Sequence, residues 1–134
     1  MIYYFEKDTV SGMILVEILL DGNHKFKMML DTGASHTTFD INALRVAEYP
    51  IGNVIQQGMV ETANGIVEID VIETKALSAF GYSVPNMNVQ IYDFIKHGIL
   101  SDYDGLLGLD FFKNTVFTID MEEQTIEVKS KKKN

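Results

Sequence analysis

Short apolar or alternating runs, separated by Gly, Asn and Asp, make up most of the chain, and long helical periods are rare. Residues 13–20 and 26–30 are two such runs around an Asp-Gly turn, which predicts a β-hairpin. Residues 59–72 predict a second hairpin with its tip at 63–65, because Asn-Gly tolerates the positive φ angles of a tight turn. The pattern therefore indicates an all-β chain.

Two further stretches, 86–91 and 117–121, alternate apolar with polar residues, and the second leads into a turn at Glu122-Glu123. Each alternating stretch can bury one face in a barrel or a sandwich. Short helices are predicted only at 42–46, 93–98 and 109–113. The chain shows no internal repeat and no interdomain linker.

The length of 134 residues, 46% of them hydrophobic and 22% charged, suits one compact domain, since two domains would each be marginal. We expect this domain to span residues 1–128. The last six residues, 129–134, contain four lysines and predict a flexible, solvated basic tail.

The composition argues against several kinds of function. The absence of Cys excludes disulfides, thiolate zinc sites and a Cys nucleophile. The net charge of −8 argues against binding to nucleic-acid phosphates. No apolar run approaches the ~20 residues of a membrane span, and the N-terminus lacks the pattern of a secretory signal. We therefore expect a cytoplasmic protein that binds neither nucleic acid nor membrane.

An apolar strand runs directly into an acid, a hydroxyl and a glycine at residues 29–35, Met-Leu-Asp-Thr-Gly-Ala-Ser. An Asp-Ser/Thr-Gly triplet is weak evidence by itself, since roughly one chain in twenty of this length contains such a triplet by chance. Here it is followed by the hairpin at 59–72 and by a second apolar-to-glycine junction at 104–112. These three features, in this order, resemble the retropepsin-like aspartic proteases, and the resemblance covers residues 13–121.

The resemblance implies a role for each motif. Asp31 is expected to be the catalytic acid, and the hairpin is expected to be a flap that closes over substrate. The remaining residues of the active-site loop would be Thr32, Gly33, Ala34 and Ser35. The flap residues that bind substrate would be Thr62, Ala63, Asn64 and Gly65. The residues that support the loop from beneath would be Leu106, Leu107 and Gly108.

The resemblance also implies the architecture and the reaction. We expect an all-β, closed-barrel single lobe with a flap hairpin and one or two short helices. Full-size aspartic proteases have two lobes with one Asp-Thr-Gly each, so a chain with one triplet must work as a homodimer. In the family, the hydroxyl corresponding to that of Thr32 bonds across the dimer axis. The predicted enzyme is an aspartic endopeptidase that hydrolyses a peptide or protein substrate with water activated between two Asp31 carboxylates, without metal or organic cofactor.

The pH range of activity follows from the residue after the triplet. Ala34 offers no hydroxyl to stabilise the ionised pair of acids, so we predict activity at mildly acidic to near-neutral pH.

Other residues have more ordinary interpretations. Asp102 and Asp104 lie near a glycine, but neither precedes Thr-Gly or Ser-Gly and no metal-loop spacing is present. The three histidines are scattered, which disfavours a zinc site. His36 follows the catalytic loop closely enough to tune it, although such a histidine is more often structural or simply exposed. Ser35 lies outside a Gly-x-Ser-x-Gly elbow. The resemblance implies that it supports the loop by hydrogen bonding.

Two alternatives to an enzyme remain open. One is a non-catalytic peptide-binding or partner-binding module on the same fold, with monomeric subunits or with its acids held apart. The other is a structural barrel that assembles with partners through its flap or its Lys-rich tail. A monomer unchanged by peptide would favour the first, and deletion of residues 129–134 tests the role of the tail.

Overall fold

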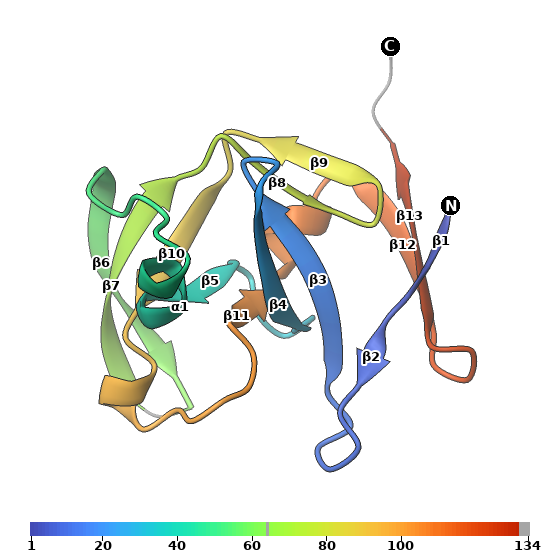
Figure 1. Ribbon diagram of the computed structural model, residues 1–134, viewed down its shortest axis with the longest axis horizontal. Helices are drawn as coiled ribbons and strands as arrows, with labels where there is room; N and C mark the ends of the chain where they lie inside the picture. Colours follow the sequence, from blue (N-terminus) through green and yellow to red (C-terminus); the bar gives the residue numbers. More distant parts are fainter. Residues whose placement is uncertain (64, 132–134) are drawn as a thin grey trace.

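A computed structural model describes residues 1–63 and 65–131 and confirms an all-β chain with three short helices (Figure 1). The strands are β1 (Ile2–Tyr4), β2 (Glu6–Lys7), β3 (Ile14–Leu20), β4 (His24–Leu30), β5 (Thr38–Asp40), β6 (Val54–Thr62), β7 (Gly65–Glu73), β8 (Ala76–Ala79), β9 (Tyr82–Pro85), β10 (Asn88–Tyr92), β11 (Gly105–Leu107), β12 (Thr115–Asp120) and β13 (Thr125–Ser130). The helices are α1 (Ile41–Val46) and two 3-10 turns, η1 (Ile95–His97) and η2 (Leu109–Phe112). All three helices lie where the sequence predicts short helices, and they number one more than the one or two that the resemblance implies.

Most strands belong to one open sheet of order β6-β7-β10-β5-β11-β4-β3-β8-β9, with β2 beside β3. Within the described part of the chain, the outermost strands β6 and β9 each pair with one neighbour, so the sheet does not close and the predicted closed barrel is wrong. In Figure 1 the β6–β7 hairpin lies at the left and β8–β9 at the top. Alternation determines which face of a strand is buried, but it does not determine whether the two edges of a sheet meet.

Both predicted hairpins are present. Strands β3 and β4 pair from Leu15↔Met29 to Leu20↔His24 around a turn that includes Gly22 at φ 77°. Strands β6 and β7 pair as far as Thr62↔Gly65, and Gly65 has φ 106°, a left-handed conformation that glycine adopts without strain. The predicted tip residue Asn64 lies outside the described residues.

A separate three-stranded sheet, β1-β13-β12, joins the two ends of the chain and lies at the right in Figure 1. Its last strand includes Lys129 and Ser130, which we expected in a solvated tail, and the Lys131 N–H donates to the Asn114 carbonyl at 2.8 Å. The strand therefore extends past the expected boundary at residue 128. The rest of the predicted tail, 132–134, lies outside the described residues.

Two apolar clusters stabilise the fold. The larger one draws residues from both sheets and includes Phe39, Leu107 and Phe111, all fully buried. The smaller one lies under the β6–β7 hairpin, where Val67 and Ile69 pack with Tyr92 and Phe94. The inner face of the hairpin thus has an apolar cluster of its own.

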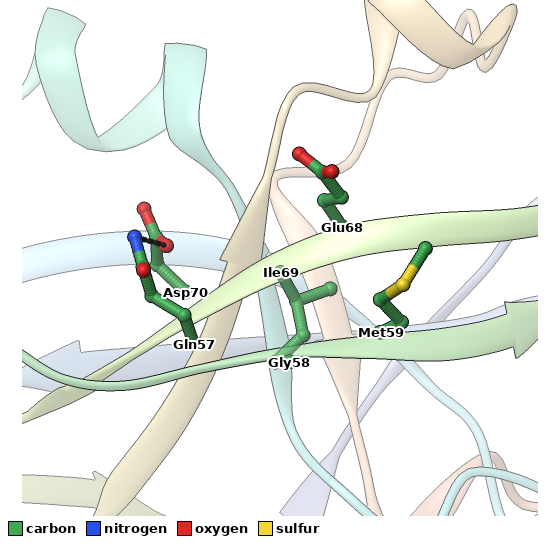
Figure 2. A pocket seen from close by; sticks show the side chains of 6 residues that line it. All are labelled: Gln57, Gly58, Met59, Glu68, Ile69 and Asp70. Carbon is green, nitrogen blue, oxygen red and sulfur yellow. Dashed lines mark hydrogen bonds between the residues drawn. The ribbon is translucent and has the colours of Figure 1, made fainter.

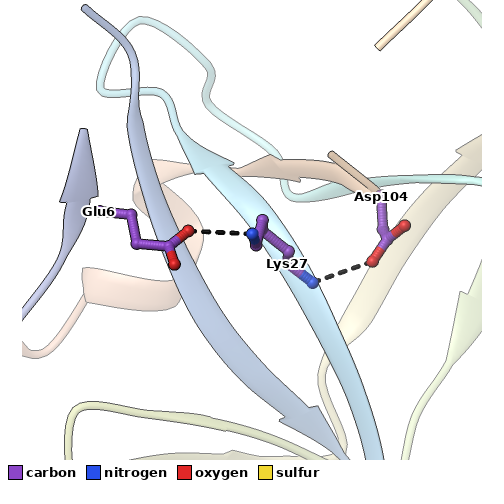
Figure 3. A network of polar contacts seen from close by, with 3 residues as sticks. All are labelled: Glu6, Lys27 and Asp104. Atoms are coloured by element: carbon purple, nitrogen blue, oxygen red, sulfur yellow. Dashed lines mark hydrogen bonds and ion pairs between the residues drawn. The ribbon is translucent and has the colours of Figure 1, made fainter. Parts of the chain in front are cut away.

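Polar contacts also connect β4 to its neighbours (Figure 3). The Lys27 ammonium lies 2.9 Å from the Glu6 carboxylate, and the Lys27 N–H donates to Asp104 at 2.9 Å. The Glu6 carboxylate raises the pKa of Lys27, chiefly through this hydrogen-bonded contact. Asp104 thereby fixes the chain just before β11, the strand that leads into the candidate site. In the described ranges, no helix has the length and hydrophobicity needed to cross a membrane.

Candidate active site

Asp31 lies at the point where β4 ends. Strand β11 runs parallel to β4, with Leu107 paired to Leu30, and the Asp31 N–H donates to the Leu107 carbonyl at 3.0 Å. The carboxylate therefore follows directly from a buried strand, although its own residue remains partly exposed. This is the placement that the apolar run before the acid predicts.

The loop after Asp31 folds back on its carboxylate. The Gly33 N–H donates to Asp31 Oδ1 at 2.9 Å, and the Ala34 N–H donates to the Asp31 carbonyl at 3.1 Å. A Cβ on Gly33 would lie 3.2 Å from Asp31 Oδ1, which is tighter than most real contacts of this kind. Glycine thus lets the backbone approach and orient the acid without displacing it.

Gly108 packs directly against the same loop. A Cβ at this position would lie 2.8 Å from the His36 carbonyl carbon and 2.9 Å from the carbonyl oxygens of Ala34 and His36. The next residue, Leu109, donates its N–H to the Ala34 carbonyl at 2.8 Å. The junction after β11 is therefore in direct backbone contact with the loop that it was predicted to support.

A buried hydrogen-bond network behind the loop was not predicted from the sequence. The Asp110 carboxylate accepts from the Thr37 N–H at 2.9 and 3.0 Å and from the Thr37 hydroxyl at 2.7 Å. The Thr37 hydroxyl oxygen also accepts from the Gly108 N–H at 3.1 Å. Thr37 is fully buried, so this network satisfies polar groups that water cannot reach. The network thereby connects η2 to the C-terminal end of the Asp31 loop.

A cleft of about 510 Å³ connects this loop to the β6–β7 hairpin. The predicted site residues that line it are Asp31, Gly33, Ala34, Ser35, Thr62, Ala63 and Leu106. Thr32 and Gly65 are exposed and do not line it, and Leu107 and Gly108 are buried beneath the loop. The fold thus brings together loop, hairpin and β11 residues that are far apart in the chain.

Much of the cleft wall is apolar or aromatic: Met29, Val60, Tyr92, Ile99, Tyr103 and Leu106. Burial and, to a smaller extent, the Asp31 charge raise the pKa of Tyr103. Burial also raises the pKa of Tyr92, with smaller contributions from Tyr103 and Asp40. Both phenols are therefore neutral hydrogen-bond donors across the physiological pH range. No local pattern points to these two tyrosines, because they reach the cleft only through the fold.

A second hollow, of about 340 Å³, lies along the β6–β7 hairpin (Figure 2). It is lined by Met59, Glu68 and four neighbours, and the Gln57 amide donates to Asp70 across the two strands at 3.3 Å. It contains no residue of the Asp31 loop. Asp31 therefore borders the larger cleft and not this hollow.

Asp102 and Asp104, the two acids near Gly105, do not line the Asp31 cleft. Asp104 accepts from Lys27, as described above, and Asp102 is exposed. Within residues 1–63 and 65–131, no group of three or more His, Asp or Glu side chains is arranged to hold a metal ion.

Comparison with known proteins identifies the family. The model of the gag-polyprotein putative aspartyl protease family matches residues 16–114, which include the Asp31 loop, the hairpin and the Gly108 junction. The chain belongs to this family. It is accordingly an aspartic-type hydrolase, the enzyme class that the sequence predicts. No curated protein matches the sequence.

Solved structures share the fold of this aspartyl protease. A retropepsin-like aspartic protease from Rickettsia conorii matches with a TM-score of 0.68 and 19% identity, over 96% of this chain and 90% of that one. The EIAV protease in complex with the inhibitor HBY-793 matches with a TM-score of 0.60 and 16% identity, over 81% of this chain and 92% of that one. The single-lobe retropepsin-like fold predicted from the sequence is confirmed.

Proposed function

We propose that this protein is an aspartic endopeptidase that works as a symmetric homodimer, with Asp31 of each subunit at the dimer axis. The observation that carries the proposal is the position of Asp31. It lies at the end of a buried strand, is oriented by the Gly33 N–H, and borders a cleft large enough for part of an extended peptide. Membership of the aspartyl protease family supports the same chemistry.

The reaction needs two carboxyl groups in different protonation states. The ionised carboxylate takes a proton from water as the water oxygen attacks the scissile carbonyl carbon, while the protonated partner donates to the carbonyl oxygen. Collapse of the resulting gem-diol breaks the C–N bond, and the amine leaves with a proton returned from the carboxyl pair. One water is consumed, and no covalent enzyme intermediate forms. Two close carboxyl groups share one proton because both cannot ionise together, as in aspartic proteases generally.

Among the described residues that line the cleft, one subunit offers a single Asp. The other carboxylate residue along the cleft, Glu61, follows Val60 on β6, and neighbouring side chains of a strand point to opposite faces. Val60 packs into the apolar cluster under the hairpin, so the Glu61 side chain is directed away from it. A second Asp31 from a symmetric partner supplies the missing carboxyl group, because a two-fold axis places the same residue opposite itself.

Thr32 fits a position at this axis. It is exposed at the loop tip, and its hydroxyl makes no hydrogen bond within the described part of the chain. In the homodimer the hydroxyl would bond to the opposite loop, as the resemblance to retropepsins implies. The β6–β7 hairpin would act as the flap, with Thr62 and Ala63 near substrate and the backbone of the hairpin available to pair with an extended peptide.

Cleavage of a diverse peptide library between pH 4 and 8 tests the proposal. The purified protein at high concentration is compared with Asp31→Asn, and the dimeric state of both is checked by analytical ultracentrifugation. We expect cleavage by the parent protein, with an optimum at mildly acidic to near-neutral pH, and none by the variant. Two folded dimers that bind peptides without cleaving them would instead support the non-catalytic binding module.

A further inference from the structure

The Asp31 cleft contains one residue that can carry a positive charge. Among the described residues that line it, His36 is the only Lys, Arg or His, whereas Asp31 and Glu61 can carry negative charge. Tyr92 and Tyr103 are the other titratable residues of the lining, and Asp110 lies behind the loop on Thr37. A carboxylate on a bound peptide would therefore meet a single cationic partner in this cleft.

The imidazole of His36 is held at one nitrogen and free at the other. Ser35 Oγ lies 2.9 Å from His36 Nδ1, and His36 Nε2 has no hydrogen-bond partner within the described residues. In the charged form both ring nitrogens donate, so Nδ1–H can bond to the Ser35 hydroxyl while Nε2–H remains available to a ligand. Ser35 thus fixes the orientation of the His36 ring and leaves the Nε2–H of that ring available.

The backbone that carries the ring is fixed on both sides. On the N-terminal side of His36, the Leu109 N–H donates to the Ala34 carbonyl. On its C-terminal side, the Asp110 carboxylate accepts from the Thr37 N–H. The His36 carbonyl accepts from the Thr38 hydroxyl at 3.4 Å and packs against Gly108. A group held on so constrained a segment loses little conformational freedom on binding, which favours recognition.

We propose that His36, oriented by Ser35, determines specificity by binding an Asp or Glu side chain of the substrate peptide. This inference rests on the proposed endopeptidase function, since it concerns the same cleft. The charged imidazole donates its Nε2–H to the substrate carboxylate. Without the charged imidazole, the Asp31 carboxylate would leave this part of the cleft negatively charged, and the preference for an acidic substrate would disappear.

The test compares matched peptides that differ only by Glu or Gln at one position, with that position moved along both sides of the scissile bond. The ratio of kcat/KM for the Glu peptide to that for the Gln peptide cancels the pH dependence of the catalytic acids. A glutamate side chain is mostly ionised at pH 5. We expect one position with a preference for Glu of about 2- to 5-fold at pH 5.

Three variants locate the effect. His36→Gln should remove the preference at pH 5, and Ser35→Ala should reduce it because the ring is less constrained. Lys96→Gln removes an exposed positive charge from η1, outside the cleft lining, and should leave the preference unchanged. An equal Glu preference in His36→Gln and in the parent protein would overturn the inference, as would the absence of any such position in the parent.

A binding measurement separates failure of this inference from failure of the proposed function. The dissociation constants of the same Glu and Gln peptides are measured by fluorescence anisotropy on Asp31→Asn at pH 5, with and without His36→Gln. A Glu preference that depends on His36 supports the acidic subsite even if the parent protein cleaves no peptide. Efficient cleavage with no Glu preference in either assay refutes the subsite and leaves the endopeptidase intact.

Discussion

Substitution of Gly108 by alanine should displace the loop after Asp31, which packs directly against this glycine. The glycine has φ −97° and ψ −180°, an extended conformation that alanine adopts freely, so the effect comes from packing alone. The new Cβ would lie 2.8 to 2.9 Å from three backbone atoms of Ala34 and His36. Because no side chain can rotate out of the way, the loop or the junction after β11 must shift.

The structure gives the size of the effect. Ordinary contact begins near 3.4 Å, so the backbone must move by about 0.5 Å, and overpacking of this kind typically costs about 1–3 kcal/mol. The same shift strains the Leu109-to-Ala34 hydrogen bond and moves the segment that follows Asp31. Since a misplacement of about 1 Å can lower a rate 100-fold, we expect kcat/KM to fall by about 10-fold or more.

The assay combines urea denaturation with peptide cleavage, and kcat/KM is corrected for the folded fraction. Gly52→Ala is the matched control, because a Cβ there meets no atom within 4 Å, and its free energy of unfolding should change by less than about 0.5 kcal/mol. If Gly108→Ala retains both the stability and the activity of the parent protein, the close contact does not position the loop and the reasoning is refuted.

Three further predictions concern individual side chains. Asp31→Asn should lower the pKa of Tyr103 but leave it above its ordinary value, because burial is the larger cause; an unchanged value in an NMR titration would contradict this. Burial and the Asp21 hydrogen bond raise the pKa of Tyr49, so the free energy of unfolding should fall above about pH 10, where the unfolded phenol ionises first. Tyr49→Phe should reduce the loss of unfolding free energy between pH 9 and pH 11, measured by denaturant unfolding. An equal loss in the variant and in the parent protein would contradict this prediction. Asp110→Ala should cost about 1–3 kcal/mol in denaturant unfolding, because it leaves the buried Thr37 N–H unpaired; a loss below about 0.5 kcal/mol would show that water replaces the carboxylate.

Local sequence patterns predicted the elements of this fold and the position of the acid. The Asp-Gly turn and the alternation at 59–72 predicted the β3–β4 and β6–β7 hairpins, because both signals act over neighbouring residues. The apolar run before Asp31 predicted a carboxylate at a strand end, and the glycine after Leu107 predicted the junction beneath it.

Features that depend on distant pairing were not predictable in this way. In the part of the chain that the structure describes, the outer strands β6 and β9 do not pair with each other, so the sheet is open, and no local pattern reports this. The Thr37–Asp110 network joins residues 73 positions apart, and Tyr103 reaches the cleft only through the fold. Lys129 has the composition of a solvated end, yet its backbone pairs with Val116 because β12 offers an adjacent strand.

The central claim, two Asp31 carboxyl groups at one dimer axis, is tested most directly by subunit mixing. Parent protein and Asp31→Asn are combined in equal amounts at fixed total concentration and incubated until the subunits exchange, and peptide cleavage is then measured. If both acids are required, random pairing leaves about one quarter of the dimers active, so the rate should be about one quarter of that of the undiluted parent. A rate of about one half would mean that each subunit acts through its own Asp31, and it would contradict the shared catalytic pair.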